Sequence, residues 1–525
     1  MSRLSSGGPT SNVHTALAAG RLGVPAVMFF VLSAAAPLTV VAGVVTTGYA
    51  VTGVVAAMPL AFLVVGAVLA VFSVGYVAMA RRVANAGALY SYVTHGLGRP
   101  AGVAAAWMAL LAYNALQVGL YGAIGAAAAP LLHDWAGLTL PWWAIALVAW
   151  AVVAVLGLLR VDLNGRVLAV LLCAELAVIA VYSVANLAHP AGGTVSLATS
   201  SPTNLAVPGA GAVLVLAVLG YVGFEGAVVF SEESRNPART VPAATYASVA
   251  VIGITYALAS WAMTVAVGAD RIVDASRELG PELLFTVAGI HLGTTAVHIG
   301  HALFLTSVAA AMIAFHNACA RYTFALGREG VLPKVFGRTG RRTGAPAIAS
   351  LTQSAIGLTV IVGYAVAGLD PLVQLFFYAG TGGGFGVLLL LTLAALAIVA
   401  HFIRRPSLDT TWQTRYAPII ATVALAVMVV LAVANFATLL GVDPTSPLRW
   451  AIPAAYPTAA LLGLAWALVL RQTRPDVYAG IGLGADAATA RTPAVADVPA
   501  AVAVKPPYPA NPSYHGRAGD RQERQ

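Results

Sequence analysis

One carboxyl side chain stands out because it lies inside a long apolar stretch. Glu175 falls in the run VLAVLLCAELAVIAVY. It follows Arg166 by nine residues, about 13 Å along a helix that rises 1.5 Å per residue. Burial disfavours the charged form of a carboxyl group, so Glu175 is a candidate for proton exchange. The alternative is a permanently protonated glutamic acid that hydrogen-bonds to a neighbouring helix.

A second apolar stretch is interrupted by a proline and small residues, in the run Ser33-Ala34-Ala35-Ala36-Pro37. Ser33 lies ten residues past Gly23, about 15 Å by the same helical rise. Pro37 has no amide hydrogen and clashes with the carbonyl of Ser33, four residues earlier. Polar backbone atoms freed inside hydrocarbon are tolerated where they line a cavity or a ligand site. The simpler alternative is a proline kink with packed neighbours.

A third apolar stretch contains two glycines three residues apart, in Gly220-Tyr221-Val222-Gly223-Phe224-Glu225. Small residues at this spacing also let helices pack closely, which is the alternative interpretation. Two breaks at a similar depth, however, predict a binding site. Half-helix N-termini hold an anionic group and unwound carbonyls hold an ammonium group, and a zwitterionic amino acid needs both.

The composition indicates which solvent surrounds these elements. Of 525 residues, 59% are hydrophobic and 9% are charged, with a mean hydropathy of +0.85, whereas soluble domains carry about 25% charged residues. The solvent must therefore be lipid, and each span needs about 20 apolar residues. Charge-free stretches predict twelve spans, numbered 1–12 here. Spans 1 and 2 lie between Arg21 and Arg81, with a turn near Thr47–Gly53, and the others at 100–130, 139–159, 166–187, 209–231, 243–268, 296–326, 346–367, 371–401, 416–440 and 450–471.

The basic residues are distributed unevenly between the loops. With the N-terminus inside, twenty Lys and Arg residues fall on the cytoplasmic side, and only Arg271, Arg277 and Arg449 fall outside. This asymmetry is what the positive-inside rule describes. It predicts a multi-pass protein of the cytoplasmic membrane with both termini in the cytoplasm. It also explains the net charge of +9 without a nucleic-acid partner.

The same pattern divides the chain into three parts. Residues 1–21 are expected to form a cytoplasmic segment and 22–472 a transmembrane domain, while 473–525 are rich in Ala, Pro and polar residues and are expected to be a disordered cytoplasmic tail. Spans 3 and 8 are both long, and spans 1 and 6 are both broken. Each pair is five apart, which predicts a five-plus-five inverted repeat followed by two C-terminal spans.

Three segments resemble a known family. GYVGFEGAVVFSEESRNPARTVPAA, residues 220–244, resembles the sixth-span signature of the amino acid–polyamine–organocation superfamily. Residues 86–102 resemble its segment before span 3, and residues 317–333 resemble its end of span 8. The resemblance covers about residues 22–472 and implies an all-α membrane fold like that of the leucine transporter. One departure is Ser33–Pro37, where many members have a Gly-Ser-Gly break.

The resemblance implies roles for particular positions. The backbone of Ser33, Ala34, Ala35 and Ala36 is expected to meet a substrate carboxylate, and that of Leu219, Gly220 and Tyr221 the amino group. Phe224 resembles the aromatic residue that closes over the substrate; the alternative is a core aromatic residue.

Other polar residues have structural and functional interpretations. Gly223 and Glu225 are expected to shape and brace span 6, and His316 is either a proton relay or a buried histidine bonded to backbone. Glu232 and Glu233, with Arg235 and Arg239, form a charged cluster, which is either a solvated face or an intracellular gate.

The coupling ion is inferred from what span 8 lacks. Its stretch Val308–His316 reads VAAAMIAFH, without a hydroxyl residue, which favours a proton over sodium. The histidines 291, 298 and 301 are not spaced as a metal site, so neither a metal nor a cofactor is expected.

These observations predict a secondary active transporter that moves amino acids or related small amines by alternating access. The expected partners are that small molecule, a proton and the lipid bilayer. A polyamine or amine permease, or an exchanger, is the alternative, and a channel or sensor represents a different class. The chain contains neither an HExxH motif nor a phosphate-binding loop, so an enzyme is not expected.

Overall fold

The computed structural model describes residues 20, 22–55, 57–83, 87–159, 161–340, 343–406 and 409–487. Within these ranges the regular structure is helical, and the one β-bridge pairs Leu22 with Ser234. Eleven helices of the described residues are long and apolar enough to cross a membrane.

These spans correspond to the predicted ones in order. Span 1 comprises α1 (Val24–Ala35), α2 (Pro37–Thr39), η1 (Val40–Val45) and α3 (Thr46–Thr52), and span 6 comprises α9 (Ala210–Gly220) and η4 (Phe224–Glu233). The others are α4 (Met58–Ala80), α6 (Arg99–Ala136), α8 (Val161–Ala188), α10 (Pro237–Val267), α12 (Glu282–Glu329), α13 (Ala347–Ala367), η6 (Pro371–Phe377) with α14 (Tyr378–Arg404), η7 (Trp412–Tyr416) with α15 (Ala417–Ala434), and α17 (Leu448–Thr473).

Shorter helices complete the bundle. The predicted span at 139–159 is occupied by α7 (Trp142–Gly157). This helix has 16 residues and is shorter than each of the eleven long helices. The connections contain α5 (Leu89–Leu97), α11 (Ile272–Leu279), α16 (Phe436–Leu440), α18 (Pro475–Ala479), and the short 3-10 turns η2 (Ala198–Ser200), η3 (Pro202–Ala206), η5 (Lys334–Gly337) and η8 (Gly484–Ala487).

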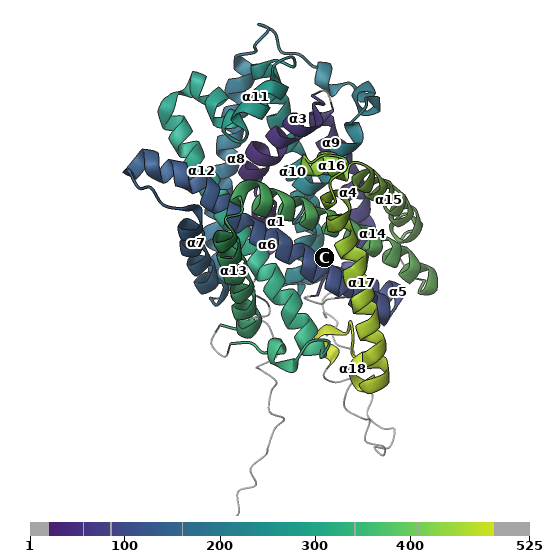
Figure 1. Ribbon diagram of the computed structural model, residues 1–525. Helices are drawn as coiled ribbons and strands as arrows, with labels where there is room; N and C mark the ends of the chain where they lie inside the picture. Colours follow the sequence, from purple (N-terminus) through teal and green to yellow (C-terminus); the bar gives the residue numbers. More distant parts are fainter. Residues whose placement is uncertain are drawn as a thin grey trace, which may run out of the picture. The chain divides into compact units, whose positions relative to one another are not determined.

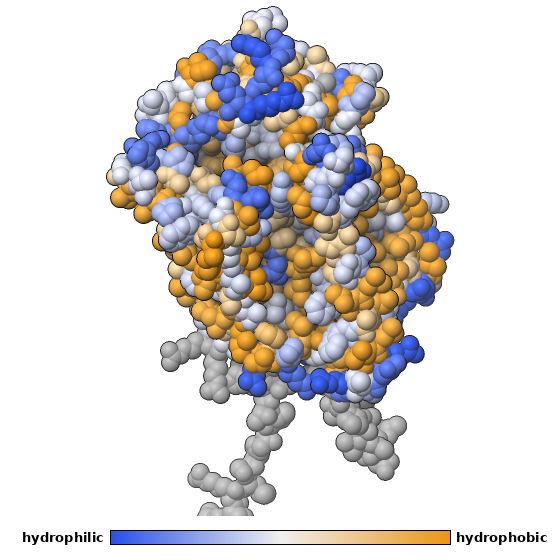
Figure 2. Space-filling model, in the orientation of Figure 1, coloured by the Kyte–Doolittle hydropathy of each residue, from blue (hydrophilic) through white to orange (hydrophobic). Residues whose placement is uncertain are grey.

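The outer surface explains how so apolar a chain is solvated. Hydrophobic residues cover the middle of the face shown in Figure 2, and hydrophilic residues gather above and below them. Val366 of α13 and Val430 of α15 are 83% and 67% exposed. Water would strongly disfavour such exposure, whereas lipid does not. The protein is therefore a multi-pass membrane protein.

The packing of the spans sets the position of the interior. Helix α6 contacts α12 and α7 on one side and α14 and α17 on another, while α10 packs along α4. In Figure 1, α7 and α13 lie together at the outside of the bundle, beside α6 and α12. Helix α12 contains Gly293 with φ 79°, which separates an arm of about three turns from the long remainder.

Both predicted breaks are present. Helix α1 ends at Ala35, and Ala36 adopts a left-handed conformation (φ 45°, ψ 69°) before Pro37 starts α2. An L-residue other than glycine pays roughly 1–2 kcal/mol for this conformation. In span 6, α9 ends at Gly220, and Gly223 (φ 112°) precedes the 3-10 helix η4.

Two short helical elements follow the predicted domain boundary at 472. Helix α18 and the turn η8 lie within the segment that was expected to be disordered. The carboxylate of Glu329, itself buried, accepts hydrogen bonds from the backbone N–H groups of Gly482 (2.8 Å) and Gly484 (2.9 Å). These bonds link the chain after α18 to α12, and the disorder expected for residues 473–525 stays a prediction. Residues 1–19 and 488–525 lie outside the described residues.

Candidate functional site

The two breaks face each other across a direct contact. A Cβ atom added at Gly223 would lie 2.8 Å from the Cβ of Ala34 and 3.0 Å from the backbone nitrogen of Ala35. Only a glycine fits this approach, because a side chain would collide with the span 1 backbone and the φ value is positive. The pattern of two glycines in span 6 thus has a steric reason at its second member.

A cavity of about 120 Å³ lies beside this contact. Its wall is almost entirely apolar, and three threonines supply its side-chain hydroxyl groups. It is lined by Ala34, Ala35, Ala36, Thr39, Val40, Gly43, Val44, Thr47, Leu116, Leu120, Leu216, Leu219, Val222, Ala311, Phe315, Phe376, Phe377, Gly380 and Thr381.

A second cavity, of about 520 Å³, adjoins the first. Both are lined by Thr39, Gly43 and Phe376. The second also reaches Asp134 near the end of α6 and Glu282 at the start of α12. The central cavity therefore continues toward the end of the bundle that carries these two carboxylates.

The predicted substrate residues divide into two groups. Ala34, Ala35, Ala36 and Leu219 line the central cavity, whereas Ser33, Gly220, Tyr221 and Phe224 do not. The hydroxyl of Tyr221 donates a hydrogen bond to the carbonyl of Phe62 (2.7 Å), which directs it toward α4. The hydroxyl of Ser33 is buried and has no partner among the described residues.

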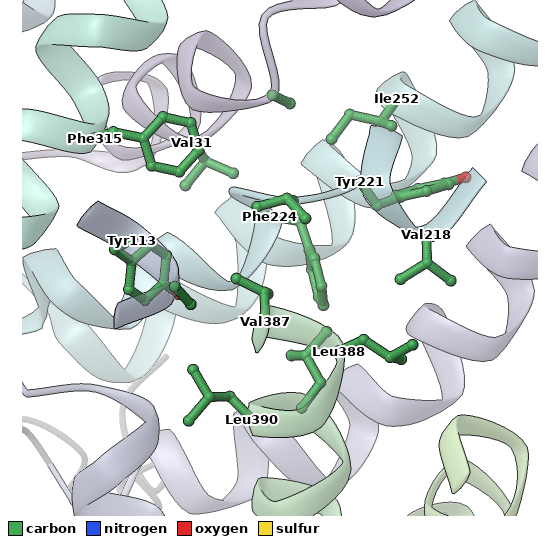
Figure 3. Packing of buried hydrophobic residues seen from close by; sticks show 14 of the residues in the cluster. Val31, Tyr113, Val218, Tyr221, Phe224, Ile252, Phe315, Val387, Leu388 and Leu390 are labelled. Atoms are coloured by element: carbon green, nitrogen blue, oxygen red, sulfur yellow. The ribbon is translucent and has the colours of Figure 1, made fainter. Parts of the chain in front are cut away.

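Phe224 packs into the core rather than against the cavity. It is fully buried, and its ring lies 6.1 Å from that of Phe72, edge to face. In Figure 3 the ring points toward Leu388 of α14 and away from Phe315. Phe315 of α12, which sequence reasoning did not select, is the aromatic residue of span 8 that lines the cavity. The role of closing over substrate stays a prediction for Phe224.

Glu175 lies at the start of the second half of span 1. Its side chain is buried, and its Oε2 accepts a hydrogen bond from the backbone N–H of Leu38 (3.4 Å). The hydroxyl of Ser307 is a further partner of this carboxyl group and accepts a bond from the hydroxyl of Thr39 (3.1 Å). A carboxylate is favoured at a helix N-terminus because the exposed N–H groups form its positive end. Glu175 thus ties α8 to the break.

Ser307 was missed because it lies one residue before the stretch Val308–His316. Its hydroxyl also accepts a 3.4 Å bond from the backbone N–H of Thr39. Span 8 therefore does bring a hydroxyl group to the break, although the nine residues after it have none. The inference from missing hydroxyls alone does not distinguish proton from sodium coupling.

Glu225 makes a buried hydrogen-bond network around the span 6 break. Its Oε1 accepts a bond from the hydroxyl of Tyr113 (2.6 Å), and its Oε2 accepts one from the backbone N–H of Gly223 (2.9 Å). Its carbonyl accepts a bond from the hydroxyl of Tyr76 (2.5 Å). The side chain holds the irregular backbone to α6 and α4, a geometry that suits the bracing role expected for it.

His316 lies away from both cavities. It is buried, and its Nε2 lies 2.8 Å from the hydroxyl oxygen of Ser350 in α13. Gly157 of α7 packs against the same ring, where a Cβ would lie 2.4 Å from Nε2. The proposed relay would therefore have to pass between α7, α12 and α13 rather than through the central cavity.

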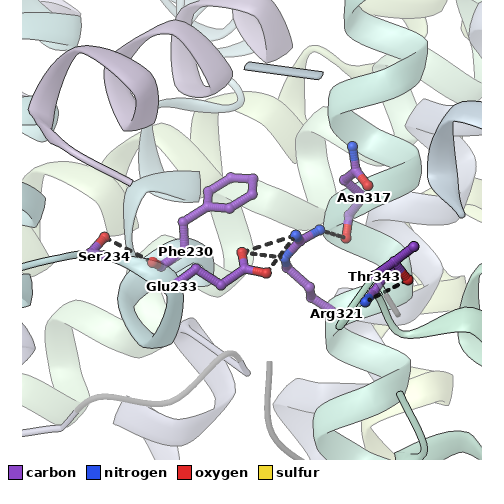
Figure 4. Close-up of polar contacts among 7 residues, drawn as sticks. Phe230, Glu233, Ser234, Asn317, Arg321 and Thr343 are labelled. Carbon is purple, nitrogen blue, oxygen red and sulfur yellow. Dashed lines mark hydrogen bonds and ion pairs between the residues drawn. The ribbon is translucent and has the colours of Figure 1, made fainter. Parts of the chain in front are cut away.

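Two ion pairs close the other end of the bundle. Arg321 of α12 donates three hydrogen bonds of 2.9–3.1 Å to the carboxylate of Glu233, and both side chains are at most 2% exposed. Arg328 bonds Glu232 in the same way, at 2.6 and 2.8 Å. Figure 4 shows Arg321 reaching from α12 to the end of η4. These glutamates are buried or nearly so, and they do not form a solvated face.

Further contacts reinforce this closure. The guanidinium carbon of Arg321 lies 4.8 Å from the ring centroid of Phe230. The segment before α1 also joins in, because the N–H of Leu22 donates to the carbonyl of Glu233 (3.0 Å) and the N–H of Arg235 to that of Leu22 (2.8 Å). Spans 1, 6 and 8 are thereby fastened together at one end, while the cavity extends toward the other.

Part of the cavity wall comes from span 10, which sequence reasoning did not select. Phe376, Phe377, Gly380 and Thr381 lie where the π-helical η6 passes into α14. The run TGGGFG, residues 381–386, was the available signal, since four glycines within six residues mark a close approach.

The family model described as amino acid permease matches residues 22–461. The low-affinity putrescine importer PlaP of Escherichia coli (strain K12) is 24% identical over 359 residues, which is 66% of this chain and 73% of that protein.

Two shorter matches point to transporters as well. The methylthioribose transporter of Bacillus subtilis (strain 168) is 24% identical over 206 residues, 39% of this chain and 41% of that protein. The chloroplastic cationic amino acid transporter 6 of Arabidopsis thaliana is 30% identical over 138 residues, 25% of this chain and 22% of that protein. The chain therefore belongs to the amino acid permease family of the amino acid–polyamine–organocation superfamily, whose members are membrane transporters and not enzymes.

Proposed function

We propose that this protein is a secondary active transporter that moves amino acids or related small amines across the cytoplasmic membrane by alternating access. The observation that carries the proposal is the cavity at the facing breaks of spans 1 and 6. Broken helices expose backbone polar groups at mid-membrane depth, which is costly unless the groups serve a site.

The helix ends at the cavity favour an ammonium group in the substrate. The C-terminal ends of α1 and α9, at Ala35 and Leu219, lie at the wall, and helix C-termini carry partial negative charge. The two carbonyls already accept one hydrogen bond each, from the hydroxyl of Tyr256 (3.0 Å) and the N–H of Val222 (3.2 Å), and each has a second lone pair for an ammonium group. The positive helix end at the break is the N-terminus of α2. Its N–H groups already have protein partners, because Leu38 donates to Glu175 and Thr39 donates to Ser307. This supports an amine group as the feature recognised, and it gives the alternative of an amine permease a specific basis.

The side-chain lining limits the rest of the substrate. No charged side chain lines the central cavity among the described residues, so a second ammonium group would be desolvated without a partner there. The apolar wall therefore supports a substrate with one ammonium group and an apolar remainder. A diamine such as the putrescine handled by one relative fits this wall less well.

Proton coupling is proposed to act through Glu175. When charged, this carboxylate stabilises the N-terminus of the second half of span 1 and bonds to span 8 through Ser307. Protonation would remove that charge and weaken the tie. The two halves of span 1 could then move relative to α8, which is how a proton would change access to the cavity.

The remaining expectations about architecture complete the proposal. The twelve spans are proposed to form a five-plus-five inverted repeat with two additional C-terminal spans, within a transmembrane domain that starts at residue 22. Both termini are proposed to be cytoplasmic, so that the Arg321–Glu233 end faces the cytoplasm. The structure would then be closed inside, with its cavity directed outward.

The experiment is uptake into proteoliposomes that contain the purified full chain. A panel of labelled amino acids, monoamines and putrescine would be offered with an inward proton gradient, an inward sodium gradient, or neither. We expect saturable uptake of a compound with one ammonium group, accumulated only under the proton gradient. Absence of uptake for every amine and amino acid would overturn the transport proposal.

The coupling step is tested by Glu175→Gln, with Asp274→Asn as the matched control because Asp274 is exposed on α11. The glutamine keeps the size and hydrogen-bonding capacity but cannot exchange a proton. We expect Glu175→Gln to retain exchange of labelled for unlabelled substrate and to lose gradient-driven accumulation. Unchanged accumulation in Glu175→Gln would refute the role of this residue.

A further inference from the structure

A third pocket, of about 380 Å³, is unlike the two cavities described above because basic side chains surround it. It lies between the α5–α6 corner, the end of α14 and the chain after α18, and it shares no lining residue with the other two. The basic residues at its wall are His95, Arg99, His401, Arg404 and Arg405. No acidic residue lines it in the described part of the chain.

Two of the arginines are held in place by the backbone. Arg404 donates to the carbonyl of Gly96 (2.6 Å), and Arg99 donates to the carbonyl of Ala479 (3.0 Å) while lying 5.5 Å from the ring centroid of Tyr478. A guanidinium group has five N–H donors. Positioned arginines with donors to spare are the usual partners of phosphate and carboxylate groups, which they bind with two parallel hydrogen bonds.

The backbone adds a further positive element. The 38-residue helix α6 begins at Arg99, and no side chain caps its first turn. Gly98 and Arg99 both line the pocket, so the N-terminus of α6 is at its wall. Pro100 has no N–H, and the N–H of Gly102 donates to the carbonyl of Gly98 (3.0 Å), so this terminus favours an anion mainly through the helix dipole.

A largely buried histidine, His401, also lines the pocket. His401 is 5% exposed, and its Nδ1 is buried without a hydrogen-bond partner among the described residues. In the imidazolium form both ring nitrogens are donors, so protonation of His401 together with anion binding would add a positive charge to this wall.

Apart from Thr94 and Gly98, the remaining wall is apolar. Ile481 and Leu483 line the pocket from the C-terminal segment, which Glu329 anchors through Gly482 and Gly484. The pocket therefore combines a positively charged wall with an apolar one. We propose that it binds a phosphate-bearing anion, either the headgroup of an anionic lipid or a soluble phosphate compound, at a site separate from the transport cavity.

The test measures thermal unfolding of the full chain in nanodiscs. In the lipid arm, phosphatidylglycerol replaces part of the phosphatidylcholine; in the soluble arm, inorganic phosphate is added to nanodiscs of phosphatidylcholine alone. The variants are Arg405→Gln and His401→Gln. Arg415→Gln is the matched control, because this exposed arginine of η7 lies outside the pocket and carries the same charge.

We expect the anion to raise the Tm of the wild type and of Arg415→Gln. In Arg405→Gln, the anion concentration that gives half of the full rise in Tm should be about tenfold higher, as expected for one lost hydrogen bond to a charged group. A response confined to the lipid arm identifies a lipid headgroup, and a response to inorganic phosphate identifies a soluble ligand. Equal responses of Arg405→Gln and the wild type in both arms would overturn the proposal. If His401→Gln does not fold, Arg405→Gln, whose side chain is exposed, still decides the question.

Discussion

The buried ion pair between Arg321 and Glu233 allows a prediction with a defined magnitude. The carboxylate of Glu233 accepts three hydrogen bonds of 2.9–3.1 Å from the guanidinium group, and both side chains are almost completely buried. Glu233→Gln removes the negative charge of this pair. Removing one partner of a buried pair costs about 3–5 kcal/mol, because the other charge is left unpaired away from water. The exposed pair Asp274–Arg277, with side chains 84% and 57% exposed, should contribute less than about 1 kcal/mol.

The assay is thermal unfolding of the purified full chain in detergent. We expect Glu233→Gln to lower Tm by several degrees and Asp274→Asn to leave it nearly unchanged. The double variant Glu233→Gln with Arg321→Gln should lose less stability than the summed losses of the two single variants, because it leaves no unpaired charge. If Glu233→Gln were no less stable than Asp274→Asn, the pair would not hold spans 6 and 8 together, and the reasoning would fail.

The same structure makes three further predictions. Gly223→Ala should abolish uptake, because φ is positive there and the new Cβ would collide with span 1, whereas Gly226→Ala, which meets nothing within 4 Å, should transport normally. Tyr113→Phe should lower stability by about 1–3 kcal/mol, read as Tm, because Glu225 loses a buried 2.6 Å hydrogen bond; an unchanged Tm would contradict this. Glu329→Gln should make the chain after α18 more sensitive to limited proteolysis, and equal digestion of both proteins would count against the anchoring role.

Elements governed by composition could be predicted from sequence. The spans follow from charge-free runs because hydrocarbon excludes charged groups along their whole length. The breaks follow from Pro37 and from the glycines of span 6, since these residues limit the backbone whatever surrounds them. Even so, the sequence placed the turn after span 1 near Thr47–Gly53, whereas the helix continues to Thr52 and turns after it.

Features set by the direction of a side chain could not be predicted in this way. Phe224 and Phe315 are both aromatic residues in apolar spans, and only the packing of α12 against the breaks places Phe315 at the cavity. The partners of Glu233 were likewise hidden, because Arg321 is 88 residues away in the chain. The hydrogen bonds from Gly482 and Gly484 to Glu329 were hidden for the same reason, since Glu329 lies more than 150 residues earlier.

The central claim, that substrate binds between the two breaks, is tested most directly by filling the cavity. Gly43 and Gly380 both line it, and a Cβ added at either meets nothing within 4 Å, so a leucine side chain would begin in open space and take up cavity volume. Gly363→Leu is the control, because Gly363 is exposed on α13 and equally free of contacts. Binding of the labelled substrate found in the uptake panel would be measured on purified protein. The account predicts that Gly43→Leu and Gly380→Leu lose binding while Gly363→Leu keeps it; wild-type affinity in both cavity variants would contradict it.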